Sequence, residues 1–145
     1  MIDKYLINTD VLIAAYTNAD KERKEIARNL LLKLYNEHKG CISIQNLEEF
    51  ANITKSKLKI IDKKKLKDDL INIQNMFEII TYNQSTVSDA LTLSFERNIN
   101  FYDALLMQTM LDNKITIIYS FDQKHFKIKG IKIINPPNLK KLIKK

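Results

Sequence analysis

Short apolar runs alternate along this chain with longer segments whose apolar residues recur every three or four positions. The apolar runs predict five strands, at residues 5–7, 41–44, 77–81, 115–119 and 131–134. The periodic segments predict helices over residues 20–38, 85–95 and 100–113, and two more that start near residues 46 and 62. A short closing helix is expected to contain Leu139, Leu142 and Ile143.

The order of these elements predicts the fold class. Nearly continuous apolar strands that alternate with helices are typical of a parallel sheet covered on both faces. No internal repeat or linker divides the chain. We therefore predict a single domain over residues 1–145, an α/β fold built as a three-layer α/β/α sandwich around a mainly parallel sheet of about five strands.

Residues that cap helices well mark several of the expected helix ends. Gly40 is expected to end the helix over residues 20–38. Asn46, with Glu49 three residues later, resembles a capping box at the start of the next helix. The remaining N-caps are expected at Asp62, Ser85 and Asn100.

Composition excludes several classes of functional site. Gly40 and Gly130 are the only glycines in the 145 residues, so the chain contains neither a Rossmann fingerprint nor a P-loop. One cysteine, Cys41, and two distant histidines, His38 and His125, exclude a disulfide framework, a zinc ribbon and an HExxH helix. We therefore expect any metal bound by this chain to have oxygen ligands.

The chain is basic, with 24 basic and 17 acidic residues and a formal net charge of +7 at pH 7. Such an excess attracts polyanions, which makes nucleic acid the first candidate partner. Residues 55–67 are rich in lysine and form either a track for a phosphate backbone or an ordinary solvated face. No signal peptide or membrane-spanning segment is evident in the sequence. We expect a cytoplasmic protein with no membrane partner.

Four acidic residues are expected at one edge of the sheet. Asp10 and Asp122 follow predicted strands, and Glu49 and Asp103 lie in the first turns of predicted helices. In a parallel α/β sheet, the carboxyl ends of the strands and the amino ends of the helices meet at the same edge. Because clustered carboxylates repel one another and no nitrogen or sulfur ligand is available, this arrangement predicts a site for Mg²⁺ or Mn²⁺.

Each of these acids also has a purely structural interpretation. Glu49 fits the role of capping-box partner of Asn46. Asp103 fits the first turn of a helix, where the helix dipole favours an acid. Asp10 and Asp122 fit ordinary turns. The convergence of all four on one edge favours the functional interpretation.

At these residues the chain resembles the PIN-domain ribonucleases, and most closely the VapC-like toxins of prokaryotic toxin–antitoxin pairs. The segments that carry the likeness are residues 5–13, 43–50 with Thr54 and Lys55, 101–105, and 118–122. The resemblance implies a domain that binds Mg²⁺ or Mn²⁺ through Glu49, Asp103 and Asp122, with the Ser120 hydroxyl as a nearby support. It also implies a cognate antitoxin and the pairing of two copies into a homodimer.

One position departs from the pattern of this family. The first metal-binding aspartate of the family usually precedes the threonine that is Thr9 here, and this chain has Asn8 at that position. Asparagine offers a metal a carbonyl oxygen but no charge. Three explanations are open: Asp10 reaches the site instead, the enzyme is naturally weakened, or a substitution was introduced to make a toxic nuclease easier to produce.

The sequence therefore leads to one main functional hypothesis and two alternatives. The main hypothesis is metal-dependent endonucleolytic hydrolysis of RNA, with Asn8, Asp10, Glu49, Asp103, Ser120 and Asp122 as the candidate site residues. One alternative is a catalytically silent PIN-like module that binds RNA or protein. The other is a phosphoacceptor receiver domain, which Asn135, Pro136 and Pro137 after the last strand disfavour, since a receiver needs a lysine there.

Overall fold

The computed structural model describes residues 3–123, 128 and 130–138. A five-stranded sheet lies at its centre, in the order β3-β2-β1-β4-β5, and every neighbouring pair is parallel. The strands are β1 (Tyr5–Ile7), β2 (Gly40–Ser43), β3 (Glu78–Ile80), β4 (Ile117–Tyr119) and β5 (Lys132–Ile134). The predicted parallel sheet is therefore confirmed. β1 has the predicted bounds, β2 begins and ends one residue earlier, and β3, β4 and β5 are shorter than their apolar runs.

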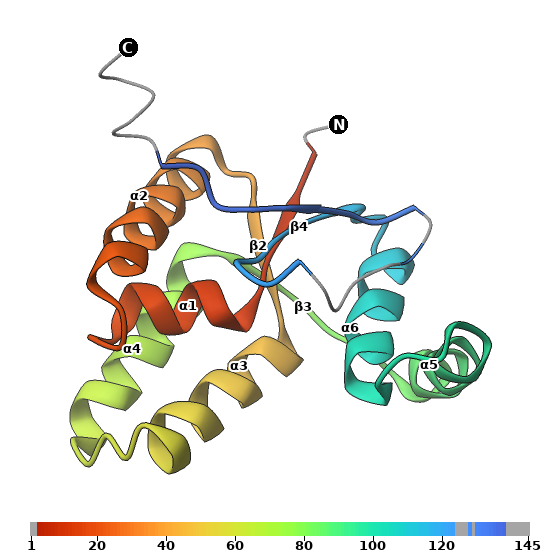
Figure 1. The fold of residues 1–145 in the computed structure, drawn as a ribbon, viewed down its shortest axis with the longest axis horizontal. Coiled ribbons are helices and arrows are strands. Elements are labelled where there is room, and N and C mark those ends of the chain that lie inside the picture. The colour runs from red at the N-terminus through yellow and green to blue at the C-terminus, as the bar shows by residue number, and fades with distance from the viewer. Residues whose placement is uncertain (1–2, 124–127, 129, 139–145) are drawn as a thin grey trace.

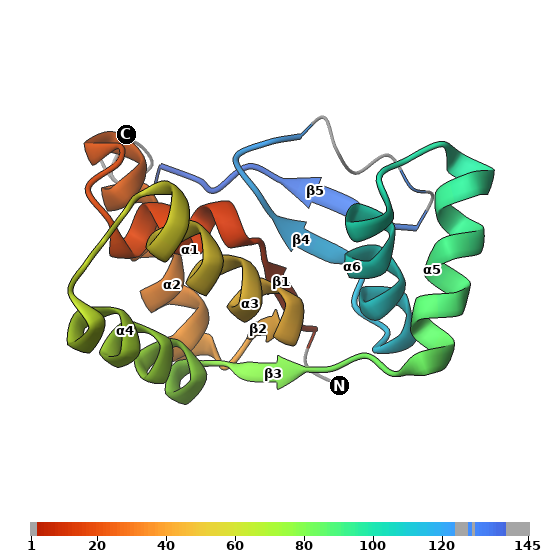
Figure 2. The ribbon, with the colours of Figure 1, turned by 90° about the horizontal axis from the view of Figure 1, so that it is seen from below.

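Helices cover both faces of this sheet (Figures 1 and 2). The helices are α1 (Thr9–Tyr16), α2 (Lys21–Glu37), α3 (Ile44–Asn52), α4 (Lys63–Met76), α5 (Gln84–Arg97) and α6 (Phe101–Asp112), and a π-helical segment, η1 (Ile53–Lys57), continues α3. None of the helices within the described ranges is both long and apolar enough to cross a membrane.

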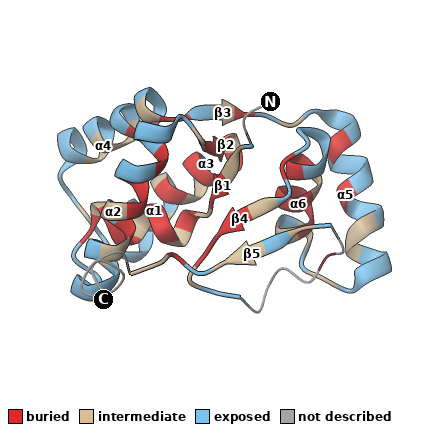
Figure 3. Cartoon of the chain, turned by 90° about the horizontal axis from the view of Figure 1, so that it is seen from above, coloured by how far each residue is buried: buried red, intermediate tan, exposed pale blue. Residues whose placement is uncertain are grey.

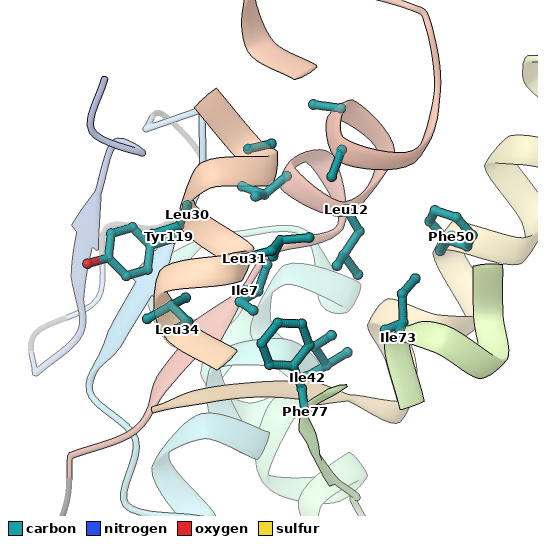
Figure 4. Close-up of a cluster of buried hydrophobic side chains, with 14 of the residues drawn as sticks. Ile7, Leu12, Leu30, Leu31, Leu34, Ile42, Phe50, Ile73, Phe77 and Tyr119 are labelled. Carbon is teal, nitrogen blue, oxygen red and sulfur yellow. The ribbon is translucent and has the colours of Figure 1, made fainter. Parts of the chain in front are cut away.

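Alternation along the strands separates two hydrophobic cores. Ile7 and Ile42 face the core that α1, α2, α3 and α4 build, whereas Leu6 and Cys41 face the core against α6. Figure 4 shows the first core, and Figure 3 shows that the buried residues gather along the strands and the inner helix faces. Successive strand residues point to opposite faces, so this division confirms the three-layer arrangement.

Helix α1 is the one helix of the described part of the chain that the sequence pattern did not predict. Its residues Thr9, Val11, Leu12, Ala14 and Ala15 are all buried. A helix enclosed on most sides has no continuous polar face, so its apolar residues do not recur at the spacing of an amphipathic helix. The sequence pattern therefore predicts only the strand at residues 5–7 here, and no helix after it.

Three predicted helix ends are wrong, and each has a physical reason. His38, at φ 57°, ends α2 in the left-handed conformation. Gly40 is instead the first residue of β2, where an added Cβ would stand 2.5 Å from Cδ1 of Phe77. The α5 cap is Asn83, whose side chain accepts from the Thr86 amide, rather than Ser85.

The third correction concerns the start of α3, close to the candidate site. Ser43 caps this helix, and Asn46 is the third helical residue of the capping box, so Glu49 does not take part in it. Asp62 and Asn100 do cap α4 and α6 as predicted. The closing helix expected at residues 139–143 lies outside the described residues.

Candidate active site

The polar edge of the sheet opens into a pocket of about 390 Å³. Five segments contribute to it: the β1–α1 junction, the start of α2, α3, the first half of α6 and the segment after β4. Five acidic residues are among its lining residues, namely Asp10, Asp20, Glu49, Asp103 and Asp122. The structure thus brings the four acids of the sequence hypothesis together at one pocket, and it adds Asp20 at the start of α2.

Asp10 ties the segment after β4 to the start of α1. Its Oδ2 accepts hydrogen bonds from the Ser120 hydroxyl at 3.0 Å, the Phe121 amide at 3.0 Å and the Asp122 amide at 3.3 Å. Its Oδ1 is buried and has no hydrogen-bond partner among the described residues. Burial raises the pKa of the Asp10 carboxyl above its ordinary value, while the hydrogen bonds act against this rise.

Asn8 and Ser120 belong to the same network. Asn8 Nδ2 donates to Ser120 Oγ at 3.2 Å, and the Asn8 backbone amide donates to the Tyr119 carbonyl. Ser120 Oγ also accepts from the Asp122 amide at 3.1 Å. Ser120 is fully buried, so its hydroxyl positions the chain around Asp122, and Asn8 is the amide that holds this hydroxyl from the β1 side.

Glu49 is oriented by a short chain of hydrogen bonds from α3 through α1. Asn46 Nδ2 donates to Thr9 Oγ1 at 3.0 Å, and Thr9 Oγ1 donates to Glu49 Oε1 at 3.0 Å. Burial raises the pKa of Glu49, and the nearby charge of Asp103 raises it further, while the Thr9 hydrogen bond opposes the rise. Because the Asp103 charge acts on Glu49, the two carboxylates share one electrostatic environment.

Gln45 is a pocket residue that sequence reasoning missed. Its side chain is only 5% exposed, and Nε2 donates to the Tyr102 carbonyl at 2.9 Å. Because that carbonyl can only accept, the amide orientation is fixed, and Oε1 is left buried with no donor in the described part of the chain. Gln45 lies one turn before Glu49 on α3, so the spacing of four residues was the signal that places both on one helix face.

The donor set of the pocket fits a hard cation. Asp10 Oδ1 and Gln45 Oε1 are buried acceptors without a donor, and they belong to residues that line the same pocket as Glu49 and Asp103. A buried acceptor without a partner is costly, and a divalent cation with its water would satisfy such oxygens. Across the described ranges, no three His, Cys, Asp or Glu side chains are gathered closely enough to hold a metal on their own. The acids therefore line the same pocket, but their side chains do not form a complete set of metal ligands.

Positive charge borders this acidic pocket. Arg23 lines it, and the Arg23 guanidinium carbon lies 4.7 Å from the centre of the Phe121 ring, a cation–π contact. On the side of α3, Ile53 lines the pocket and begins η1, which carries Lys55 and Lys57. The lysine-rich stretch of the sequence therefore starts directly beyond the pocket wall.

Comparison with known proteins identifies the family that this architecture represents. The family model described as "PIN domain" matches residues 5–131. No curated protein sequence matches the chain.

Solved structures share the fold at low sequence identity. The VapBC2 complex of Rickettsia felis, bound to a DNA fragment from its promoter, contains a chain 18% identical to this one, with a TM-score of 0.69 and coverage of 93% of this chain and 98% of that chain. VapC20 of Mycobacterium tuberculosis, a toxin that cleaves the sarcin–ricin loop, is 16% identical, with a TM-score of 0.65 and coverage of 84% and 92%. A toxin–antitoxin complex from Klebsiella pneumoniae contains a chain that is 18% identical, with a TM-score of 0.66 and coverage of 92% and 98%.

Proposed function

Because the chain belongs to the PIN domain family, we propose that it is a Mg²⁺- or Mn²⁺-dependent endoribonuclease and the toxin of a VapC-like toxin–antitoxin pair. The observation that carries the proposal is the pocket at the polar edge of the sheet. Acids from five separate segments line it, and two buried oxygens of its lining residues have no donor among the described residues. The likeness of the fold to toxins of this type supports the same conclusion.

Glu49, Asp103 and Asp122 would hold the cation, with Asn8 and Asp10 beside them. When bound, a divalent cation neutralises charge on a phosphodiester and lowers the pKa of water, which is the chemistry that RNA hydrolysis needs. The remaining residues position these groups. Thr9 orients the Glu49 carboxylate, and Ser120 holds the chain at Asp122.

Positive charge around the pocket would draw the RNA backbone toward the acids. The net charge of +7 favours capture of polyanions, and Arg23, Lys55 and Lys57 lie at or next to the pocket wall. Arg23 is held by its contact with Phe121 and by Asp20, whose Oδ2 lies 3.8 Å from Arg23 Nε. A guanidinium held in this way is suited to a phosphate group of the substrate.

The test is cleavage of RNA by the purified chain with Mg²⁺ or Mn²⁺, in the presence and absence of a chelator. Cleavage that requires the metal and is lost in Glu49→Gln and Asp103→Asn supports the proposal. Glu48→Gln is the matched control, because Glu48 is the exposed neighbour of Glu49 and does not line the pocket. Cleavage that survives in Glu49→Gln, or that ignores the chelator, would refute it.

The second candidate function is a catalytically silent PIN-like module that binds RNA or protein. It is favoured by Asn8, which supplies no charge to the pocket and is committed through Nδ2 to Ser120. Restoring an acid with Asn8→Asp separates the two candidates. A chain that gains or keeps metal-dependent cleavage is a nuclease, and a chain that stays inactive while it still binds RNA is the silent module.

The proposed partners are an antitoxin and a second copy of the chain. One candidate surface for these contacts is a hollow between α2 and α4, whose lining includes Tyr16, Arg28, Met76 and the exposed Leu32. A separate apolar row lies on α5, where Phe95 is 81% exposed. Light scattering on the chain and on Leu32→Asp and Phe95→Asp variants shows which surface supports self-association, and a monomeric parent chain would refute the proposed homodimer.

A further inference from the structure

Position 8 is neutral in this chain, whereas position 10, two residues later, carries a carboxylate. We propose that Asp10 supplies the anionic oxygen toward a divalent cation in the pocket that Asn8 does not supply, while it also anchors the segment after β4. This inference rests on the cation site of the proposed function. It selects the first of the three explanations for Asn8, in which the acid has moved along the chain rather than been lost.

The hydrogen bonds of Asp10 give its two oxygens different roles. Oδ2 accepts from three donors, the Ser120 hydroxyl and the amides of Phe121 and Asp122. Three donors on one oxygen fix the plane of the carboxylate, and therefore the position of Oδ1. Oδ1 accepts from no donor within the described structure, is buried, and belongs to a residue that lines the pocket. A buried carboxylate oxygen held in place without a donor suits a cation.

The side chain of Asn8 donates a hydrogen bond in this network, whereas that of Asp10 accepts. Its Nδ2 donates to Ser120 Oγ at 3.2 Å, which fixes the amide and leaves one neutral carbonyl oxygen. The Ser120 hydroxyl in turn donates to Asp10 Oδ2 at 3.0 Å. Asn8 therefore acts as a hydrogen-bond donor to the network at which the Asp10 carboxylate is the acceptor. The two residues are therefore connected through the Ser120 hydroxyl.

Gln45 supplies a second, independent indication of a ligand in the pocket. Gln45 is 5% exposed, and its Nε2 donates to the Tyr102 carbonyl. Its Oε1 has no donor among the described residues. A neutral acceptor and a carboxylate oxygen, both without donors, line one pocket. A cation with its hydration water is the species that satisfies both types of oxygen.

The experiment measures Mn²⁺ binding without RNA, by calorimetry and by the electron paramagnetic resonance of free Mn²⁺. Four chains are compared: the parent, Asp10→Asn, Asn8→Asp, and the exchange variant Asn8→Asp/Asp10→Asn. An amide oxygen at position 10 can still accept from Phe121 and Asp122, so the fold is expected to persist, and thermal melting without metal checks this. Asp62→Asn is the matched control, because it removes the same charge at the α4 cap, where asparagine serves equally well.

Asp10→Asn is expected to weaken Mn²⁺ binding by at least about tenfold, and the exchange variant is expected to recover most of that loss. Asn8→Asp should bind at least as tightly as the parent, and Asp62→Asn should bind like the parent. Parent-like affinity in Asp10→Asn would overturn the inference. So would a parent that binds no Mn²⁺ while Asn8→Asp does, a result that does not depend on the folding of the position-10 variants.

RNA cleavage by the same chains separates this inference from the proposed function. A parent that binds Mn²⁺ through Asp10 but leaves RNA intact would support the inference and refute the nuclease. A parent that cleaves RNA, and an Asp10→Asn variant that binds Mn²⁺ equally well, would support the nuclease and refute the inference.

Discussion

Gly40→Ala is expected to destabilise the fold through one steric conflict. Gly40 is buried in β2, and a Cβ added there would lie 2.5 Å from Cδ1 and 2.7 Å from Cε1 of Phe77, and 3.3 Å from Cβ of Leu34. Ordinary contact begins at 3.4 Å, so the aromatic ring must move by almost 1 Å inside a closed core. Phe77 is itself buried, so the ring has little space in which to move.

Two opposing effects decide the magnitude of this change. Overpacking a closed core costs roughly 1–3 kcal/mol. Alanine also restricts the unfolded chain, which stabilises the fold by about 0.4–1 kcal/mol where the backbone accepts it, and Gly40 is not at positive φ. The net loss is therefore roughly 1–2 kcal/mol. For a domain of this size, this corresponds to a fall in Tm of about 3–8 °C.

The assay is thermal and urea unfolding of Gly40→Ala, Phe77→Leu and the double variant. A smaller side chain at position 77 removes the conflict, so the double variant should be more stable than the sum of the single losses by roughly 0.5–3 kcal/mol. Gly130→Ala is the control: at φ 96° alanine is strained by the backbone itself, and no described atom lies within 4 Å of an added Cβ, so Phe77→Leu should not rescue this loss. Additive losses at positions 40 and 77 would refute the argument.

Four further predictions concern the site and its surroundings. Glu49→Gln should raise the free energy of unfolding at pH 7 and flatten its pH dependence. Because the pKa of Glu49 is raised in the folded state, that state binds more protons than the unfolded state as pH rises past the ordinary carboxyl pKa, and the stability of the parent chain falls there. An unchanged slope in urea titrations from pH 4 to 8 would contradict this. Thr9→Val should lower the free energy of unfolding in urea by about 1–3 kcal/mol and reduce cleavage, because Asn46 Nδ2 and Glu49 Oε1 lose their hydroxyl partner. Parent-like stability and activity would count against this prediction. Cys41 should resist alkylation at pH 8 until urea unfolds the chain, because it is buried and burial raises the pKa of its thiol to about 12; rapid labelling of the folded chain would disprove this. Replacing Lys55 and Lys57 with alanine should lower the slope of log affinity for single-stranded RNA against log salt by about 1.4, measured by filter binding, and an unaltered slope would exclude contact with phosphates.

Much of the fold was predictable because its signals are local. Apolar runs and caps such as Asp62 depend on residues a few positions apart, and the parallel arrangement follows from their alternation. Helix α1 was missed because burial on most sides removes the periodic polar face. The role of Ser43 was missed because a buried polar residue at a strand end resembles the strand itself until its hydrogen bond to the Asn46 amide is seen.

The candidate site was predictable in its members but not in its connections. Strand ends and helix starts bring Asp10, Glu49, Asp103 and Asp122 to one edge in any parallel α/β sheet, and the structure has them line one pocket. The bonds from residues 120–122 to Asp10 span more than 100 positions, and no local pattern encodes them. For the same reason, the sequence left open whether Asp10 or Asn8 is the residue that matters.

The pairing of β1 with β4 also has a consequence for synthesis of the protein. The first strand meets β4 only after residue 117 has been made, and three hydrogen bonds to the Asp10 carboxylate come from residues 120–122. A growing polypeptide still attached to the ribosome therefore cannot complete the pocket until almost all of the domain has emerged. Under the proposed function, truncated products that end before β4 should be inert toward RNA, and only finished molecules should cleave it.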